Sequence, residues 1–170
     1  MNNKTLTKIA MIAAIYTALC FIPGLSNLAY GQVQVRVAEA LTLLPLIYQP
    51  AIWGVTLGCF LANLVGNMTG MNPTGLIDII VGTMATFLAA NCTYMLRNKK
   101  VGNIPLWSIL MPVVFNFVFI GIELAFIFMP DNLFLGTLIN GSYVAIGELI
   151  AVIIGYILIR QLEKTNIFDE

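Results

Sequence analysis

Long stretches of this sequence contain no charged residue. None lies between Glu39 and Asp78, and none lies between Asp78 and Arg97. Only 9% of the residues are charged and 59% are hydrophobic, whereas a soluble domain averages about 25% charged residues. Eight acidic and eight basic side chains are too few to cover a water-exposed surface of ordinary size. The sequence therefore predicts an all-α integral membrane protein whose main solvent is lipid.

Six apolar segments divide the chain, and each is long enough or nearly long enough to cross roughly 30 Å of hydrocarbon as a helix. Polar turns separate the segments, and residues 129–138 are expected to form a loop. The second and third segments are short, so one re-entrant hairpin that leaves four full spans is the alternative. Residues 1–170 are expected to form a single transmembrane domain. The six expected transmembrane helices cover residues 6–21, 35–48, 51–66, 75–96, 105–128 and 140–162.

The basic residues predict the orientation of the chain. Six spans place both termini on the same side of the membrane, and seven of the eight basic residues fall on that side. Only Arg36 falls on the other side. Because cytoplasmic loops carry the excess of Lys and Arg, both termini are expected to be cytoplasmic, in a multi-pass protein of a bacterial plasma membrane. The seven basic residues are Lys4, Lys8, Arg97, Lys99, Lys100, Arg160 and Lys164.

Several classes of function lack support in the sequence. The net charge is zero, which gives no basic surface for nucleic acid. The chain has no histidine, so the commonest metal ligand and the commonest general base are both missing. No phosphate-binding loop, HExxH motif or GxSxG motif is present. We therefore expect no enzyme activity, no bound metal and no cofactor in this chain.

The acidic residues gather in one half of the predicted bundle. Glu39, Asp78, Glu123 and Glu148 belong to four different expected helices, and each lies in the outer half. An ionisable group inside a membrane is costly unless it is paired, and it usually faces the interior or a cavity. Four acids cannot all pair with Arg36, although Arg36 and Glu39 at i,i+3 spacing fit a purely structural ion pair. Some of the acids must therefore be protonated or await a ligand with donors or positive charge, and the pattern predicts an outward-opening pocket for a polar solute.

Amide and aromatic side chains accompany the acids. Asn63 and Asn67 share a helix face by i,i+4 spacing. Tyr30, Phe117 and Tyr143 have the size to sandwich a flat ring, although each also fits an interfacial belt or a packing role. The candidate substrate-binding residues are Gln34, Arg36, Glu39, Asn67, Asp78, Asn116, Glu123, Tyr143 and Glu148.

Small residues recur every four positions in three of the expected helices. Such stripes let helix backbones approach closely in lipid. Each stripe fits packing within this chain or docking onto a separate membrane subunit. The stripes are Ala10, Ala14 and Ala18; Gly54 and Gly58; and Gly147, Ala151 and Gly155.

A longer motif lies at residues 30–45, where the sequence reads Tyr-Gly-Gln-Val-Gln-Val-Arg-Val-Ala-Glu-Ala-Leu-Thr-Leu-Leu-Pro. The whole chain resembles the substrate-binding S components of energy-coupling factor (ECF) transporters, in its size, its six expected helices, its long outer loop and its alanine stripe. The motif itself is similar to the signature of the QueT family, which is assigned to queuosine precursors.

The resemblance implies a mode of action. The first outer loop would cap the pocket, and the fourth to sixth helices would supply much of the rest. The face of Ala10, Ala14 and Ala18 would contact a transmembrane coupling subunit, and two partner ATPases would use the ATP. The S component would topple in the membrane to deliver a 7-deazaguanine, such as the aminomethyl or cyano precursor or queuine.

The expected ligand agrees with the acidic residues. One carboxylate can accept from both the N–H and the NH₂ of a guanine-like edge, and a second would suit a cationic aminomethyl group. We expect Glu39 in one role and Glu123 or Glu148 in the other. The alternatives are an S component for another vitamin-like solute and a stand-alone proton-coupled carrier that uses Glu123 and Glu148. A membrane enzyme would need a catalytic set that the sequence does not offer.

Overall fold

The computed structural model describes residues 2–22, 36–72, 74–165 and 167–168. Within these ranges the protein is helical, apart from one isolated bridge between Val101 and Ile104. The all-α prediction is therefore confirmed for the described residues. The helices are α1 (Asn3–Cys20), η1 (Val37–Leu46), α3 (Ala51–Met68), α4 (Leu76–Leu96), α5 (Leu106–Phe128), η2 (Pro130–Asn132) and α6 (Leu133–Leu162).

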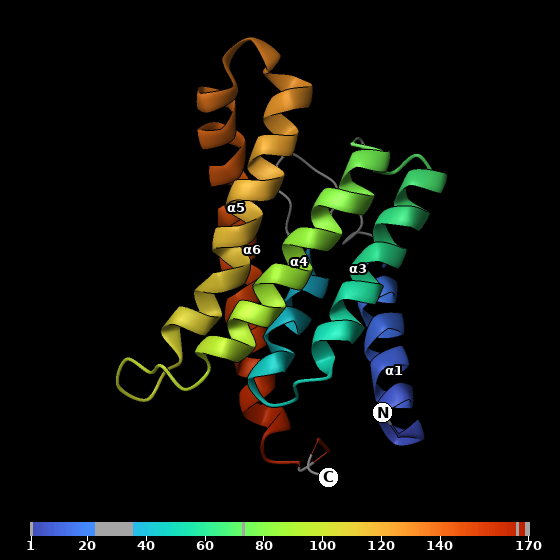
Figure 1. Ribbon diagram of the computed structural model, residues 1–170, viewed down its shortest axis with the longest axis vertical. Helices are drawn as coiled ribbons and strands as arrows, with labels where there is room; N and C mark the ends of the chain where they lie inside the picture. Colours follow the sequence, from blue (N-terminus) through green and yellow to red (C-terminus); the bar gives the residue numbers. More distant parts are fainter. Residues whose placement is uncertain (1, 23–35, 73, 166, 169–170) are drawn as a thin grey trace.

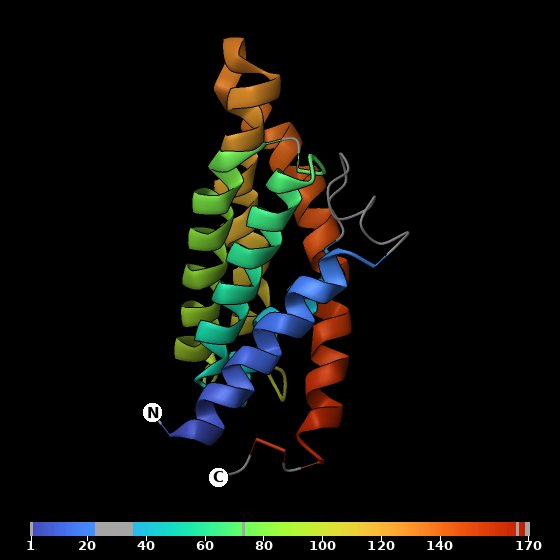
Figure 2. The ribbon, with the colours of Figure 1, turned by 90° about the vertical axis from the view of Figure 1, so that its right-hand side faces the viewer.

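The long helices pack in chain order around a short central helix. Helices α3, α4 and α5 stand side by side in Figure 1, while α1 crosses α3 obliquely in Figure 2. The short 3₁₀-helix η1 contacts α1, α3, α4, α5 and α6. Its residues from Ala38 to Pro45 are all buried. The second expected span contains a buried helix of 10 residues, about 20 Å long at about 2 Å per residue, which is shorter than the roughly 30 Å of the hydrocarbon core.

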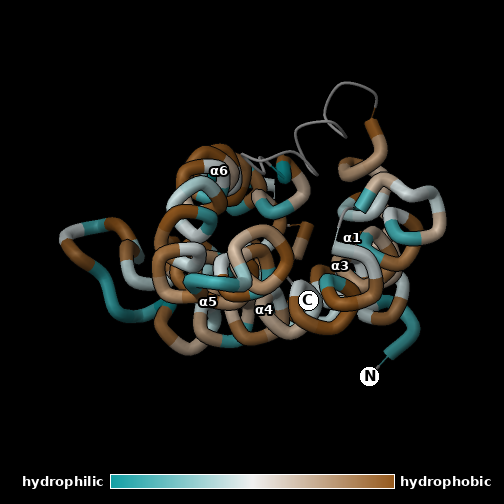
Figure 3. The backbone as a smooth tube through the Cα atoms, turned by 90° about the horizontal axis from the view of Figure 1, so that it is seen from above, coloured by the Kyte–Doolittle hydropathy of each residue, from teal (hydrophilic) through white to brown (hydrophobic). Residues whose placement is uncertain are grey.

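The other helices have the length and composition of membrane segments. Among the described residues, α3, α4, α5 and the stretch Pro130–Leu162 are long and apolar enough to cross a membrane. Helix α1 has 18 residues but carries Lys4 and Lys8 and is less apolar. Figure 3 shows hydrophobic residues on the outward sides of the helices, and Trp53 and Phe134 are among the exposed ones. Apolar side chains on so much of the surface require contact with lipid.

The start of α6 differs from the sequence prediction. Residues 129–138 were expected to be a loop, but α6 begins at Leu133. The Asn132 side chain caps this helix because its Oδ1 accepts from the Leu135 N–H at 3.1 Å. The turn is therefore only η2, and α5 and α6 form a tight hairpin that extends beyond α3 and α4 (Figure 1).

Two of the three small-residue stripes pack within the chain. A Cβ on Gly58 would lie 2.6 Å from the Tyr16 Cβ, so α1 and α3 touch closely there. A Cβ on Gly155 would lie 2.4 Å from the Ala40 carbonyl oxygen, so α6 and η1 touch closely as well. The third stripe behaves differently, because its alanines stand exposed on α1. These are Ala10, Ala14 and Ala18.

The basic residues gather at one end of the molecule. The start of α1, the end of α6 and the α4–α5 loop all lie at this end, which we call the termini end (Figures 1 and 2). The seven basic residues that were assigned to one side of the membrane belong to these segments. The hairpin turn between α5 and α6 lies at the opposite end (Figure 1).

Candidate functional site

A buried ion pair ties the start of η1 to α4. Arg36 Nη2 donates to Asp78 Oδ2 at 2.8 Å, and Arg36 Nη1 donates to Asn63 Oδ1 at 3.3 Å. Asn72 Nδ2 donates to the same Asp78 oxygen at 2.8 Å, and Asn63 Nδ2 donates to the Asp78 carbonyl at 2.8 Å. This Arg36 network (Arg36, Asn63, Asn72 and Asp78) therefore joins η1, α3, the α3–α4 turn and α4.

The local sequence positions Asp78 within this network. Asp78 lies in the first turn of α4, where the helix dipole favours negative charge. Gly82 lies one turn further on. A Cβ there would lie 2.2 Å from Asp78 Oδ1 and 2.8 Å from Asn63 Nδ2, so only glycine leaves room for both side chains.

Two further carboxyl groups face a small central cavity. The Tyr16 hydroxyl donates to Glu39 Oε1, and Asn116 Nδ2 donates to Glu148 Oε1 at 2.8 Å. The second oxygens, Glu39 Oε2 and Glu148 Oε2, are buried and have no hydrogen-bond partner among the described residues. Each carboxyl group is thus anchored through one oxygen and leaves the other unused. The cavity has a volume of about 10 Å³ and is lined by Arg36, Glu39, Asn116, Ile120, Val144 and Glu148.

Glu123 is the least satisfied of the acids. It is buried on α5, and neither of its carboxyl oxygens has a hydrogen-bond partner in the part of the chain that the structure describes. The Thr74 hydroxyl faces Glu123, but it donates to Asn72 Oδ1 at 2.8 Å. The hydroxyl proton of Thr74 is therefore not available to Glu123.

The buried acidic residues outnumber the buried basic residues in the part of the chain that the structure describes. Glu39, Asp78, Glu123 and Glu148 are only 2–4% exposed, while Arg36, at 8%, is the one buried basic residue among those described. Burial of an ionised group is costly unless hydrogen bonds or an opposite charge compensate it. The site is consequently suited to a molecule that brings hydrogen-bond donors or positive charge.

The structure brings together most of the residues that the sequence singled out. Arg36, Glu39, Asn116 and Glu148 line the central cavity, and Asp78 binds Arg36. The ion-pair partner of Arg36 is thus Asp78 on another helix, whereas the i,i+3 spacing had suggested Glu39. Long-range packing, which a local spacing cannot encode, selects this partner.

The remaining candidates do not line the cavity or are not among the residues that the structure describes. Tyr143 is 46% exposed on α6, and Asn67 is half-buried beside Gly75. The ring of Phe117 packs against Gly141, so it is occupied by helix contact. Gln34 and Tyr30 lie outside the described residues.

Sequence reasoning missed Tyr16 as a member of the site. Tyr16 is fully buried in α1, and its hydroxyl is bound to Glu39. The available signal was a phenol in the middle of an apolar helix, since a buried tyrosine hydroxyl usually has a partner. Asn72 was among the amides that the sequence placed near the outer surface, whereas Thr74 was missed because no sequence pattern marks its position beside α4.

Tyr16→Phe tests the anchoring of Glu39. The variant is expected to lower the free energy of unfolding by about 1–3 kcal/mol, because Glu39 Oε1 loses its donor while remaining buried. Thermal unfolding of the detergent-purified protein measures the change. The matched control is Tyr143→Phe, which removes a hydroxyl from an exposed tyrosine. Equal midpoints for the two variants would contradict the anchoring role.

Apolar helices that enclose a polar cavity are typical of membrane proteins that hold a solute within the bilayer. A family model described as "QueT transporter" matches residues 6–164, and the chain belongs to the QueT transporter family. The chain is also 28% identical to the "Queuosine precursor transporter QueT" of Lactococcus lactis subsp. cremoris (strain MG1363), over 96% of this chain and 95% of that protein. No solved structure matches the chain. The protein is therefore a multi-pass transporter of the cell membrane.

Proposed function

We propose that this chain is the solute-binding S component of an ECF-type importer and that it takes up queuosine precursors. One observation carries the proposal: Glu39 and Glu148 line the same buried cavity, and each has one carboxyl oxygen anchored and the other without a partner. Two supports are independent of this geometry. They are the name of the lactococcal relative and the likeness of residues 30–45 to the family signature.

The ligand that best matches this arrangement is a cationic 7-deazaguanine. One carboxylate of the cavity accepts from the adjacent N–H and NH₂ groups of the guanine-like edge. The other carboxylate binds the ammonium of an aminomethyl group. A positively charged ligand also reduces the imbalance between the four buried acids and Arg36. We therefore expect the aminomethyl precursor to bind more tightly than the uncharged cyano precursor.

Entry of such a ligand requires the cavity to widen. Its volume of about 10 Å³ corresponds to room for about one water molecule, which is far less than a bicyclic ring needs. The cavity residues Arg36 and Glu39 lie at the start of η1, whereas Asn116 and Glu148 belong to α5 and α6. Ligand binding is thus expected to move the start of η1 away from α5 and α6.

The partners follow from the exposed stripe on α1. Ala10, Ala14 and Ala18 are exposed on α1, and small residues allow close approach of another helix. We assign this face to a transmembrane coupling subunit that works with two ATPase subunits, which use the ATP. Both termini are assigned to the cytoplasm because the basic residues gather at the termini end.

Calorimetry on detergent-purified protein tests the ligand. The aminomethyl compound is expected to bind about 10- to 100-fold more tightly than the cyano compound, because a hydrogen bond to a charged group contributes about 1.5–3 kcal/mol. Guanine is the control for the ring alone. Absence of binding by every deazapurine, from protein with an intact unfolding transition, would overturn the queuosine assignment.

Uptake by proteoliposomes tests the class of transporter. An S component requires the coupling subunit, the ATPases and ATP. The rival is a proton-coupled carrier, which the unpartnered oxygens of Glu123 and Glu148 also favour. Uptake by the chain alone that an ionophore abolishes would replace our proposal with the carrier.

A further inference from the structure

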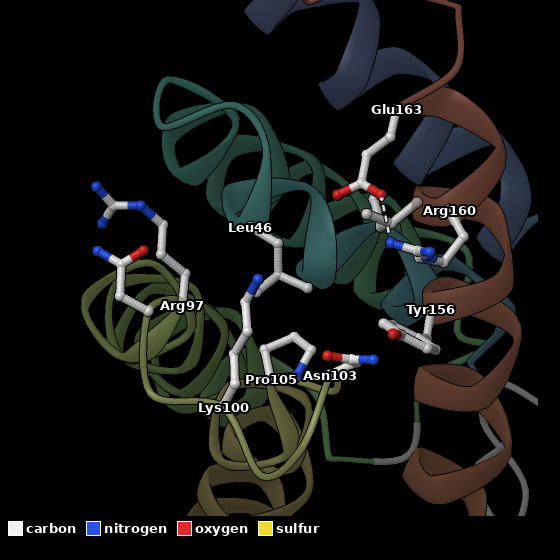
Figure 4. Close-up of a pocket in the computed structure, with 10 residues that line it drawn as sticks. Leu46, Arg97, Lys100, Asn103, Pro105, Tyr156, Arg160 and Glu163 are labelled. Atoms are coloured by element: carbon white, nitrogen blue, oxygen red, sulfur yellow. Dashed lines mark hydrogen bonds and ion pairs between the residues drawn. The ribbon is translucent and has the colours of Figure 1, made fainter.

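A second pocket lies at the termini end, at the opposite end of η1 from the central cavity. It has a volume of about 180 Å³, more than ten times the roughly 10–15 Å³ that one water molecule needs. The α4–α5 loop, the end of η1 and the end of α6 form its walls (Figure 4). The lining residues that matter here are Arg97, Lys100, Asn103, Tyr156, Arg160 and Glu163.

Positive charge predominates around this pocket. Three of the lining residues are basic and Glu163 is the single acid. Glu163 is already paired, because its Oε2 accepts from Arg160 Nη1 at 3.1 Å. Within the described residues, no carboxylate lies within salt-bridge distance of Arg97 or Lys100.

The side chains surround the pocket from several elements. In Figure 4, Lys100 of the α4–α5 loop and Arg160 of α6 lie on opposite sides of the pocket, with the amide of Asn103 between them. Arg97 lies at the rim and is held there, since Nη1 donates to the Tyr94 carbonyl at 2.7 Å and the guanidinium lies 3.7 Å from the Tyr94 ring centroid.

We propose that this pocket binds a phosphate group. An ammonium, a guanidinium and an amide that converge on one space are the donors that phosphate oxygens accept. Basic pockets between membrane helices near the cytoplasmic surface bind anionic headgroups. The phosphate has two possible sources, the headgroup of an anionic phospholipid and a soluble phosphate.

A purely structural role explains only part of the pattern. Helices α4 and α6 end at this pocket, and basic residues stabilise the negative ends of helix dipoles. That effect accounts for Arg97 and Arg160. It does not account for Lys100, which lies beyond the end of α4 and faces Arg160 across the space. Lys99 provides a comparison, because it is a neighbouring exposed lysine that does not line the pocket.

The experiment uses the full-length chain with phosphatidylglycerol, phosphatidylcholine and inorganic phosphate as probes. Native mass spectrometry of the detergent-purified protein measures retained lipid, and thermal unfolding measures the effect of phosphate. We expect wild type to retain phosphatidylglycerol over phosphatidylcholine. Lys100→Gln and Arg160→Gln are each expected to reduce that preference about fivefold or more, since a basic residue near a lipid surface contributes about 1 kcal/mol.

Each outcome is decisive. Retained phosphatidylglycerol that depends on Lys100 and not on Lys99 supports the site and identifies lipid as the source. A phosphate-induced rise in the unfolding midpoint with the same dependence, without lipid preference, supports the site with a soluble ligand. Equal losses in Lys99→Gln and Lys100→Gln, or no effect of any probe, overturn it. If Arg160→Gln does not fold, Lys100→Gln in the exposed loop still decides the question.

Discussion

Glu39→Gln is expected to weaken binding of the aminomethyl-deazaguanine by roughly 30- to 700-fold. Glu39 Oε2 is buried beside the central cavity without a partner, and the substitution replaces a charged acceptor by a neutral amide. Loss of one member of a buried, hydrogen-bonded charge pair costs about 2–4 kcal/mol in binding. The Tyr16 hydroxyl still finds the amide oxygen, so the fold is expected to survive. Calorimetry measures the affinity, and thermal unfolding verifies the fold.

Two further variants give this prediction its controls. Glu163→Gln makes the same chemical change at an exposed position and should leave the affinity unchanged. Glu148→Gln distinguishes the two roles, since the acid that binds the ammonium also determines the preference for the aminomethyl over the cyano ligand. Wild-type affinity in Glu39→Gln would remove Glu39 from the binding site.

Asp78→Asn is expected to lower the free energy of unfolding by about 3–5 kcal/mol. The variant leaves the Arg36 guanidinium buried without the carboxylate that now binds it at 2.8 Å, and breaking a buried ion pair by removing one partner is strongly destabilising. The loss should appear as a lower midpoint of thermal unfolding in detergent.

A double variant distinguishes the effect of breaking the ion pair from the effect of changing the Asp78 side chain alone. Arg36→Met with Asp78→Leu replaces both charges by apolar groups and should recover much of the stability, because apolar replacement of a buried pair is often close to neutral. Glu163→Gln breaks the exposed pair with Arg160, whose side chains are 62% and 41% exposed, and should cost less than about 1 kcal/mol. A cost as small for Asp78→Asn would show that the Arg36 network contributes little to stability.

Much of the architecture was predictable because lipid restricts the choices open to a chain. Apolar length and turn residues gave the approximate limits of α1, α3, α4 and α5. The same physics predicted that buried acids face the interior, and Glu39 and Glu148 do line a common cavity. The start of α6 at Leu133 could also be predicted from the sequence, because Asn132 precedes an apolar run and is a good N-cap residue.

Other features depend on contacts that no local pattern contains. The partner of Arg36 lies 42 residues away on α4. The exposure of Tyr143 and the burial of Tyr16 depend on which face of each helix meets a neighbour. The compact form of η1 arises because it is enclosed by α1, α3, α4, α5 and α6, and periodicity does not distinguish a short buried helix from a span.

The enclosed position of η1 has a mechanical consequence. Glu39, near one end of this helix, lines the central cavity, and Leu46, at its other end, lines the basic pocket. Residues 39–46 of η1 thus link the central cavity directly to the basic pocket at the termini end. Because Gly155 brings α6 against the Ala40 carbonyl, η1 cannot shift along its axis without displacing α6. If our proposal holds, we therefore expect the movement of η1 that admits a solute to the central cavity to displace α6 and the basic pocket as well.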